Sequence, residues 1–214
     1  MIYPVKGYTN MSERDGVLMV ISGPAGSGKG AAVKLLFDIV PELTLSVSAT
    51  TRSPRPGEVD GVHYFFISKE EFREKLAAGE ILEHTEYCGN YYGTPEKAVR
   101  DTLSRGRDVI LEIEVDGASQ IKKKFPDAVT VMLLPPDGKS LEARLRGRGT
   151  ETDDVIAARM ARARAEIALA DSYDYIVVSR DGEAEKCAGD IASILVAEHA
   201  KRARMKSVIE GFFA

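Results

Sequence analysis

The sequence predicts an α/β protein, in which a parallel sheet is flanked by helices and a small β-rich lobe is inserted into this core. Apolar runs of strand length alternate with amphipathic helices through most of the 214 residues, as in parallel sheets covered on both faces. A glycine-rich loop joins the first strand to the first helix. Residues 46–94 interrupt the alternation with turns and short strands, and we interpret them as the inserted lobe.

The first strand and helix enclose the most informative loop of the chain. Val17–Ile21 is apolar, and the helix that follows the loop repeats apolar residues at i, i+3, i+4 and i+7 up to Val40. The loop has the form G-x-x-x-x-G-K and is followed by Gly30. Its residues are Gly23, Pro24, Ala25, Gly26, Ser27, Gly28 and Lys29. Inward-pointing backbone N–H groups, a helix N-terminus and a lysine together favour a bound polyphosphate over a functionless turn.

The composition argues against several classes of function. With 29 basic and 33 acidic residues, the net charge of -4 gives no general attraction to nucleic acid or anionic membranes. Cys88 and Cys187 are far apart, which argues against a disulfide framework or a zinc site. No apolar run reaches the ~20 residues of a spanning helix and no signal-peptide core is present, so we expect a cytoplasmic protein. Monomer and homodimer both stay open.

The remaining elements follow in chain order. Residues 1–15 are expected to form an N-terminal extension, with Met11 as an alternative start, and 206–214 a C-terminal tail. A helix opens at Ser68 as a capping box, and another has Thr94 as its N-cap. The expected strands are 43–49, 63–67, 81–87, 108–115, 128–134 and 175–178, and the other helices are 119–124, 141–149, 153–171 and 183–205.

The inserted lobe carries a basic turn and several tyrosines. Arg52 and Arg55 lie three apart in a proline-rich turn, and their planar guanidinium groups suit a doubly charged phosphate. Alone, such a pair is more often a solvated loop. Tyrosine hydroxyls and the carboxylates of Glu58 and Glu83 in the same lobe favour a polar binding pocket.

At this point the sequence resembles the guanylate kinase family over residues 16–205. The segments that carry the resemblance are SVSATTRSPRPGEVDGVHYFF (46–66), GNYYGT (89–94), LEIEVDGA (111–118), LRGRGTET (145–152) and RMARARAEI (159–167). The family implies transfer of the γ-phosphoryl group of ATP to GMP, and also to dGMP, with Mg²⁺. It implies a phosphate-loop core (16–45, 95–136 and 169–205), a GMP-binding lobe (46–94) and a helical lid (137–168).

The resemblance also implies roles for individual residues. Those expected to hold the GMP phosphate are Arg52, Arg55, Tyr64 and Tyr92, with Glu58 beside them. Those expected to read the guanine are Ser48, Glu83, Thr94 and Glu114. Guanine presents two adjacent donors, the ring N1–H and the exocyclic amine, and an ionised carboxylate such as that of Glu83 can accept both. Adenine has a bare acceptor at N1 and is expected to be rejected.

The other half of the expected site is acidic and basic residues around ATP. Glu112 and Glu114 share one face of their expected strand, and by the resemblance Glu112 contributes to the Mg²⁺ shell through water. Lys29, Arg148 and Arg159 match the family's catalytic cations, which neutralise charge during phosphoryl transfer. Arg146, Arg162 and Arg164 are expected to be solvated surface, and the three histidines to have no catalytic role.

Two departures from the family pattern concern the ATP half of the site. Ala31 stands where a threonine is usual, and Ser179-Arg180-Asp181 replaces Asn-Asp-Asp. Two alternatives stay open beside an active guanylate kinase. One is a guanylate-kinase-like binding module with weak or no turnover, and the other is a kinase of another small phosphorylated substrate.

Overall fold

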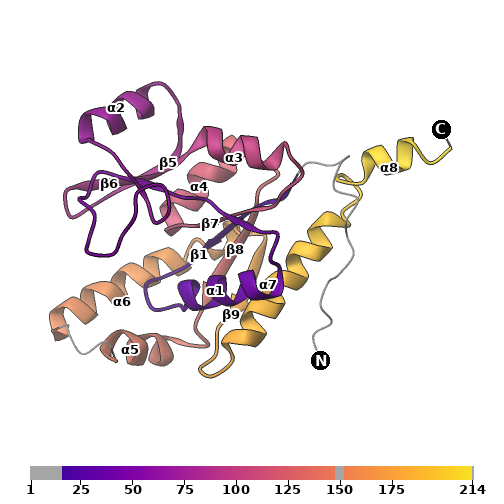
Figure 1. Ribbon diagram of the computed structural model, residues 1–214. Coiled ribbons are helices and arrows are strands. Elements are labelled where there is room, and N and C mark those ends of the chain that lie inside the picture. Colours follow the sequence, from indigo (N-terminus) through magenta and orange to yellow (C-terminus); the bar gives the residue numbers. More distant parts are fainter. Residues whose placement is uncertain (1–15, 148–151, 214) are drawn as a thin grey trace.

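The computed structural model describes residues 16–147 and 152–213 (Figure 1). The large sheet is parallel and has the strand order β2-β7-β1-β8-β9. Its strands are β1 (Leu18–Ser22), β2 (Thr44–Leu45), β7 (Val109–Glu112), β8 (Val129–Leu134) and β9 (Tyr175–Val178). The predicted α/β core with a parallel sheet is confirmed.

Helices cover both faces of this sheet, and the central strand β1 shows why. Met19 and Ile21 pack with residues of α1 (Lys29–Ile39) and α7 (Ala184–His199). Leu18 and Val20, with the opposite parity, pack with α3 (Glu96–Leu103) and α4 (Val115–Lys124). An apolar strand without alternation therefore contributes to two cores at once. Cys187 of α7 lies in the first core, as expected from its apolar neighbours.

A second sheet of four strands forms the inserted lobe, in the order β4-β3-β6-β5. Its elements are β3 (Ala49–Thr50), β4 (Phe65–Phe66), α2 (Lys69–Ala77), β5 (Ile81–Tyr87) and β6 (Asn90–Pro95). Phe72 of α2 is fully buried and stacks on Tyr91 at 5.3 Å between ring centroids. Ser68 caps α2 by accepting a hydrogen bond from the Glu71 N–H, so the N-cap of the predicted capping box is confirmed.

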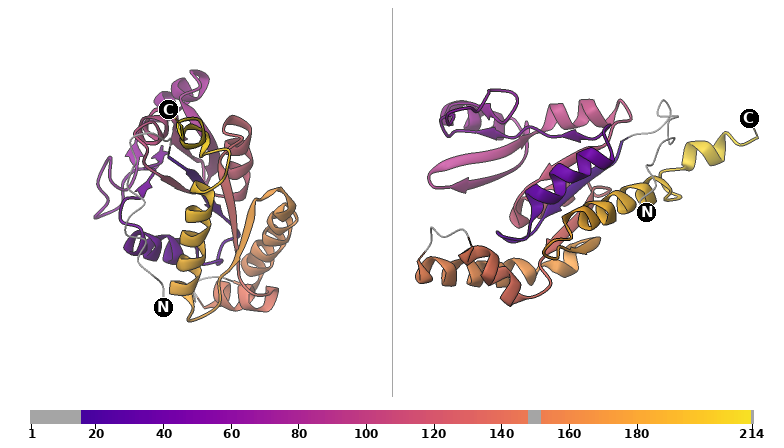
Figure 2. Two further views of the ribbon diagram at one scale, coloured as in Figure 1. Left: turned by 90° about the vertical axis from the view of Figure 1, so that its right-hand side faces the viewer. Right: turned by 60° about the horizontal axis from the view of Figure 1, so that its bottom comes forward.

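A pair of helices, α5 (Gly138–Arg146) and α6 (Asp153–Ile167), has a small core of its own around Leu141, Leu145 and Ile156. This pair and the small sheet extend from the same end of the large sheet (Figure 1). Figure 2 shows α8 (Lys206–Glu210) projecting away from the body beyond α7. Within the described ranges, no helix is long and apolar enough to cross a lipid bilayer.

Several expected boundaries were wrong, each for a local reason. The single strand expected at 43–49 is two strands, because the chain leaves the large sheet after β2 and enters the small sheet at β3. Thr94 is not an N-cap but a residue of β6, whose last residue Pro95 caps α3. Glu114 is not on a strand; it is the N-cap of α4, which begins earlier than expected.

The lid and the C-terminus also differ from expectation. Helix α5 begins at Gly138 because the Asp137 carboxylate accepts the Ser140 N–H at 2.7 Å. The expected helix 153–171 ends at Ile167 and is followed by the 3-10 helix η1 (Ala170–Ser172). The expected C-terminal helix ends at His199, and part of the expected tail is the short helix α8. The expected extension, residues 1–15, lies outside the described residues.

Candidate active site

The glycine-rich loop curls between β1 and α1, as the sequence predicts. Gly23 has φ 147°, and a Cβ there would lie 2.2 Å from the Leu133 carbonyl oxygen, so only glycine fits. Gly28 is the N-cap of α1 with φ 94°, also in the left-handed region. The Lys29 ammonium donates to the Gly23 carbonyl at 2.6 Å, which holds it against the loop. The loop thus combines a helix N-terminus with a held cation, the arrangement that binds phosphates.

The loop also contains an unusual buried hydroxyl. Ser27 is fully buried, and its Oγ has no hydrogen-bond partner among the residues that the structure describes. A buried polar atom without a partner is costly unless a ligand or water satisfies it. The Ser27 hydroxyl thus keeps unused hydrogen-bonding capacity inside the loop.

Arg144 of α5 covers the far side of the loop, and our sequence reasoning did not assign it a role. Its guanidinium donates to the carbonyls of Gly26 and Ser27 at 3.4 and 3.3 Å, and to the Ser179 carbonyl at 2.6 Å. It also pairs with Asp181 at 2.8 Å. One side chain thus joins helix α5, the glycine-rich loop and the segment after β9. Sequence spacing shows that Arg144 and Arg148 lie one turn apart, but it cannot show a contact across 35 residues.

Glu112 lies at the carboxyl end of β7, beside the loop. A Cβ built on Gly30 would lie 3.6 Å from its Oε1. The surrounding protein atoms raise the pKa of Glu112, and the positive charge of Lys29 opposes this rise. Across the described part of the chain, no cluster of three or more His, Cys, Asp or Glu side chains could hold a metal by itself. Any ion here would rely on few protein ligands.

A second basic site lies in the small lobe. The Arg52 guanidinium binds Glu58 through two nitrogens, at 2.8 and 2.9 Å, and lies over the Tyr64 ring at 5.5 Å. Glu58 also accepts the Arg55 N–H at 2.7 Å. Tyr64 and Tyr92 meet edge to face with ring centroids 6.0 Å apart. These predicted residues are therefore brought together, and Glu58 holds the basic turn in place.

The charges of this cluster follow from these contacts. The hydrogen bonds from Arg52 and from the Arg55 backbone lower the pKa of Glu58 to about 2, and Glu58 in turn raises the pKa of Arg52. Burial raises the pKa of the Tyr64 hydroxyl, so the phenol stays protonated and can donate. The cluster thus offers cationic and neutral donors to an anion.

Glu83 lies deeper in the lobe and is only 5% exposed. Its Oε1 accepts a hydrogen bond from Thr94 Oγ1 at 2.7 Å. Burial raises the pKa of this carboxylate, while the Thr94 hydrogen bonds and the charge of Lys124 oppose the rise. Ser48 lies half-buried between β2 and β3, and its carbonyl accepts the Phe65 N–H. A buried acid fixed on one oxygen suits a ligand that donates protons to it.

The lid arginines occupy different surroundings. Arg148 lies outside the described residues, and Arg159 is half-buried on α6. Arg162 is exposed, as expected, and it also pairs with Glu166 at 2.7 Å and with Glu114 at 3.5 Å. The Glu114 contact joins the lid to the start of α4. His199, expected to be an ordinary residue, is mostly buried and bonds Asp108 at 2.8 Å, which fixes α7 to the start of β7.

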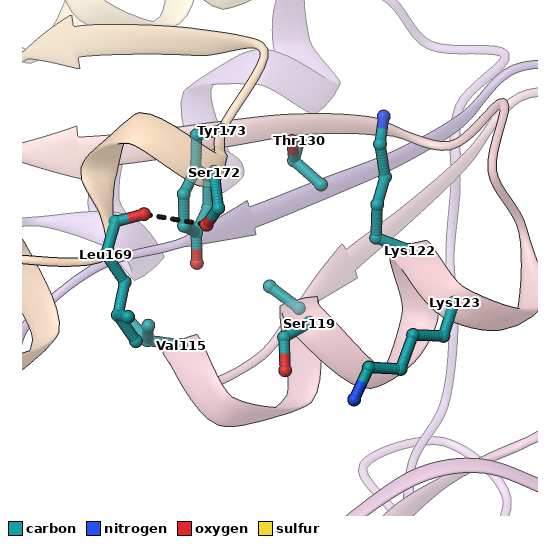
Figure 3. A pocket seen from close by; sticks show the side chains of 9 residues that line it. Val115, Ser119, Lys122, Lys123, Thr130, Leu169, Ser172 and Tyr173 are labelled. Carbon is teal, nitrogen blue, oxygen red and sulfur yellow. Dashed lines mark hydrogen bonds between the residues drawn. The ribbon is translucent and has the colours of Figure 1, made fainter.

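A cavity of about 380 Å³ lies between α4 and η1 (Figure 3). Its lining residues are Val115, Ala118, Ser119, Lys122, Lys123, Thr130, Leu169, Ser172 and Tyr173. Lys122 is already bound to Asp174 and to the Ala128 carbonyl, both at 2.7 Å. Because its residues come from neither the phosphate loop nor the basic turn, we do not assign this cavity to the site.

The fold and the site together define an α/β protein with a glycine-rich loop of the phosphate-loop type and a basic, tyrosine-lined cluster in an inserted lobe. The sequence profile of the guanylate kinase family matches residues 15–198. A guanylate kinase of Streptococcus thermophilus is 53% identical over 190 residues, which cover 88% of this chain and 90% of the relative. One of Halalkalibacterium halodurans is 48% identical over 195 residues, covering 91% and 95%.

A solved structure gives the same result. The crystal structure of guanylate kinase from Anaplasma phagocytophilum superposes with a TM-score of 0.70 at 34% identity, and covers 91% of this chain and 92% of its own. The chain belongs to the guanylate kinase family.

Proposed function

We propose that this protein transfers the γ-phosphoryl group of ATP to GMP, giving ADP and GDP, and that it accepts dGMP as well. The observation that carries this proposal is the pairing of a phosphate loop with a separate lobe in which a buried carboxylate, Glu83, is held by Thr94. A triphosphate donor fits the first, and a base with two adjacent N–H donors fits the second. Membership of the guanylate kinase family supports the same reaction.

On the donor side, the phosphate loop from Gly23 to Gly30 would cradle the ATP phosphates. Lys29 would neutralise charge on the transferring group, and Arg148 and Arg159 of the lid would close on it. Arg144 joins this group in our proposal, because its guanidinium already spans the loop carbonyls and Ser179.

On the acceptor side, Arg52 and Arg55 would hold the GMP phosphate together with the hydroxyls of Tyr64 and Tyr92. Glu58 would orient the basic turn, since its carboxylate is engaged by Arg52 and by the Arg55 backbone. Those we propose to read the guanine are Ser48, Glu83, Thr94 and Glu114.

The residues present fit Mg²⁺ in the manner typical of nucleotide kinases. Mg²⁺ prefers oxygen ligands, keeps several waters and is held by one or two carboxylates plus substrate phosphates. Glu112, which lies beside Gly30 of the loop, would supply the carboxylate through water, and the ATP phosphates would supply the other oxygens. When bound, the ion neutralises phosphate charge during transfer.

The protein's own contribution is positioning and charge stabilisation. The attacking GMP phosphate oxygen is already ionised at neutral pH, so the reaction needs no general base. The basic side chains hold donor and acceptor in line and offset the charge that spreads over the transferring group. We propose the cytoplasm as the compartment and a monomer or homodimer as the oligomeric state.

The test is ADP release from ATP and Mg²⁺ in the presence of GMP, AMP, UMP or ribose 5-phosphate, each in a separate reaction. The proposal expects release with GMP alone. GMP binding without ADP release would indicate a binding module, and release with ribose 5-phosphate would indicate another kinase.

A further inference from the structure

The side chain of Gln120 joins helix α4 to strand β5. It makes paired hydrogen bonds to the strand backbone, as a neighbouring strand would. The Gln120 Oε1 accepts the backbone N–H of His84 at 3.2 Å, and its Nε2 donates to the His84 carbonyl at 3.1 Å. Both backbone groups of one residue are thus satisfied by a single side-chain amide. Each hydrogen bond alone is ordinary, but the two together fix the position and orientation of the His84 backbone in β5 relative to helix α4.

The contact lies next to Glu83, where the strand needs support. The pairing of β5 with β6 shifts register between Ile81 and His84, so Glu83 lies within an irregular part of the ladder. Such bulges re-aim side chains and leave the local backbone less constrained by the sheet. At this point, therefore, Gln120 supplies a restraint on the strand from the helix side.

Gly117 acts on the same carboxylate from one turn earlier on α4. A Cβ at position 117 would lie 2.7 Å from Glu83 Oε2 and 3.2 Å from the Ile113 side chain. Residues three apart on a helix lie on one face, so Gly117 and Gln120 both face β5. Gly117 contributes backbone without a side chain, and Gln120 contributes its amide. The carboxylate is bounded by Gly117 on one oxygen and held by Thr94 on the other.

We infer that Gln120 is a positioning residue for guanine recognition. By holding the His84 backbone of β5 against helix α4, it sets the position of the neighbouring Glu83 carboxylate. The inference rests on the proposed function, because it assigns Glu83 to the guanine. Two parallel hydrogen bonds from N1–H and the exocyclic amine require both carboxylate oxygens in place. A carboxylate that shifts or turns loses one of the two bonds.

The main variant is Gln120→Met, which keeps the length of the side chain and removes both amide bonds. We expect its KM for GMP to rise about tenfold, the effect of roughly 1.4 kcal/mol of lost positioning. The preference for GMP over IMP, which lacks the exocyclic amine, should fall several-fold. The kcat at saturating GMP and the KM for ATP should stay within about twofold of wild type. A purely structural role would lower kcat and stability together.

A double-mutant cycle tests whether Gln120 acts through Glu83. In a Glu83→Gln background, Gln120→Met should add little to the loss of GMP use, because coupled residues are not additive. Full additivity, or an unchanged KM for GMP in Gln120→Met, overturns the inference. Lys123→Gln, at an exposed position of the same helix, is the matched control. It should leave every parameter unchanged.

A second variant covers the case in which Gln120→Met does not fold. Gln120→Glu keeps the shape and one acceptor but sets a carboxylate oxygen against the His84 carbonyl in place of a donor, and it should raise the KM for GMP in the same direction. An unchanged KM in that variant also overturns the inference. Wild-type protein in the same assay separates the two claims: no phosphorylation of GMP by wild type refutes the proposed function, whereas an active wild type with unaffected variants refutes the positioning role alone.

Discussion

The Arg144 guanidinium of α5 donates to the carbonyl of Ser179 at 2.6 Å, and so ties the lid helix to the segment after β9. The same group reaches the phosphate-loop carbonyls of Gly26 and Ser27. Ser179 is one of the positions at which this sequence departs from the family pattern. The departure therefore coincides with a contact that holds the proposed ATP side together.

Arg144→Lys keeps the charge and removes the planar fork, so it cannot span the loop and Ser179 at once. We expect the KM for ATP to rise about tenfold or more, with the binding of GMP little changed. Steady-state kinetics with each substrate varied in turn provides the measurement, and Arg164→Lys on the exposed face of α6 is the control. Equal effects on both substrates would show that Arg144 has no special link to the donor.

Ala31→Thr restores the hydroxyl that is usual after the phosphate loop. Position 31 lies in the first turn of α1 and is exposed, so the larger side chain fits. Because a hydroxyl adds an oxygen near the proposed ion, we expect a higher turnover or tighter Mg-ATP binding, by several-fold. Rates measured across a magnesium titration test this. Indifference to the substitution would argue against our placement of the ion near Glu112.

Glu83→Gln should separate function from stability. Burial raises the pKa of Glu83, so the ionised carboxylate lowers the stability of the folded state at pH values above its folded-state pKa. This loss of stability is relieved as the pH falls through that pKa. Glutamine removes the charge, so the melting temperature at neutral pH should not fall and should rise by a few degrees. The kcat/KM for GMP should fall at least about 100-fold, with ATP binding much less affected.

The wild type offers a matching pH test of Glu83. Protonation removes an acceptor, so the KM for GMP should rise as the pH falls through the folded-state pKa of Glu83, and the variant should lack this rise. Equal losses of GMP and ATP use in Glu83→Gln would contradict the assignment of this residue to the base.

Glu58→Gln should change the acid sensitivity of the lobe. Its pKa is lowered from 4.5 to about 2, chiefly by the hydrogen bond from Arg52. The pair therefore contributes stability that is fully present above about pH 4.5 and is lost as the pH falls toward 2. Acid unfolding followed by circular dichroism should be less steep for the variant between those values. Superimposable curves would show that the pair contributes nothing to the folded state.

Local patterns predicted much of this molecule from sequence. The phosphate loop follows from its glycines and flanking elements, β5 has the expected bounds, and the cap at Ser68 is confirmed. Contacts between distant segments were not predictable in this way. Arg144 was missed because its partners lie across the fold, and Gln120 because its value depends on how closely α4 approaches β5. Glu114 was expected on the strand and is instead the N-cap of α4, because an apolar run does not show at which residue the strand ends and the helix begins.

The most direct test of the central claim uses ATP labelled in its γ-phosphate, with GMP and Mg²⁺. The account predicts that the label appears in the β-phosphate of GDP, in a one-to-one ratio with the ADP formed. Label that stays in ATP, or that appears only in inorganic phosphate, would contradict it.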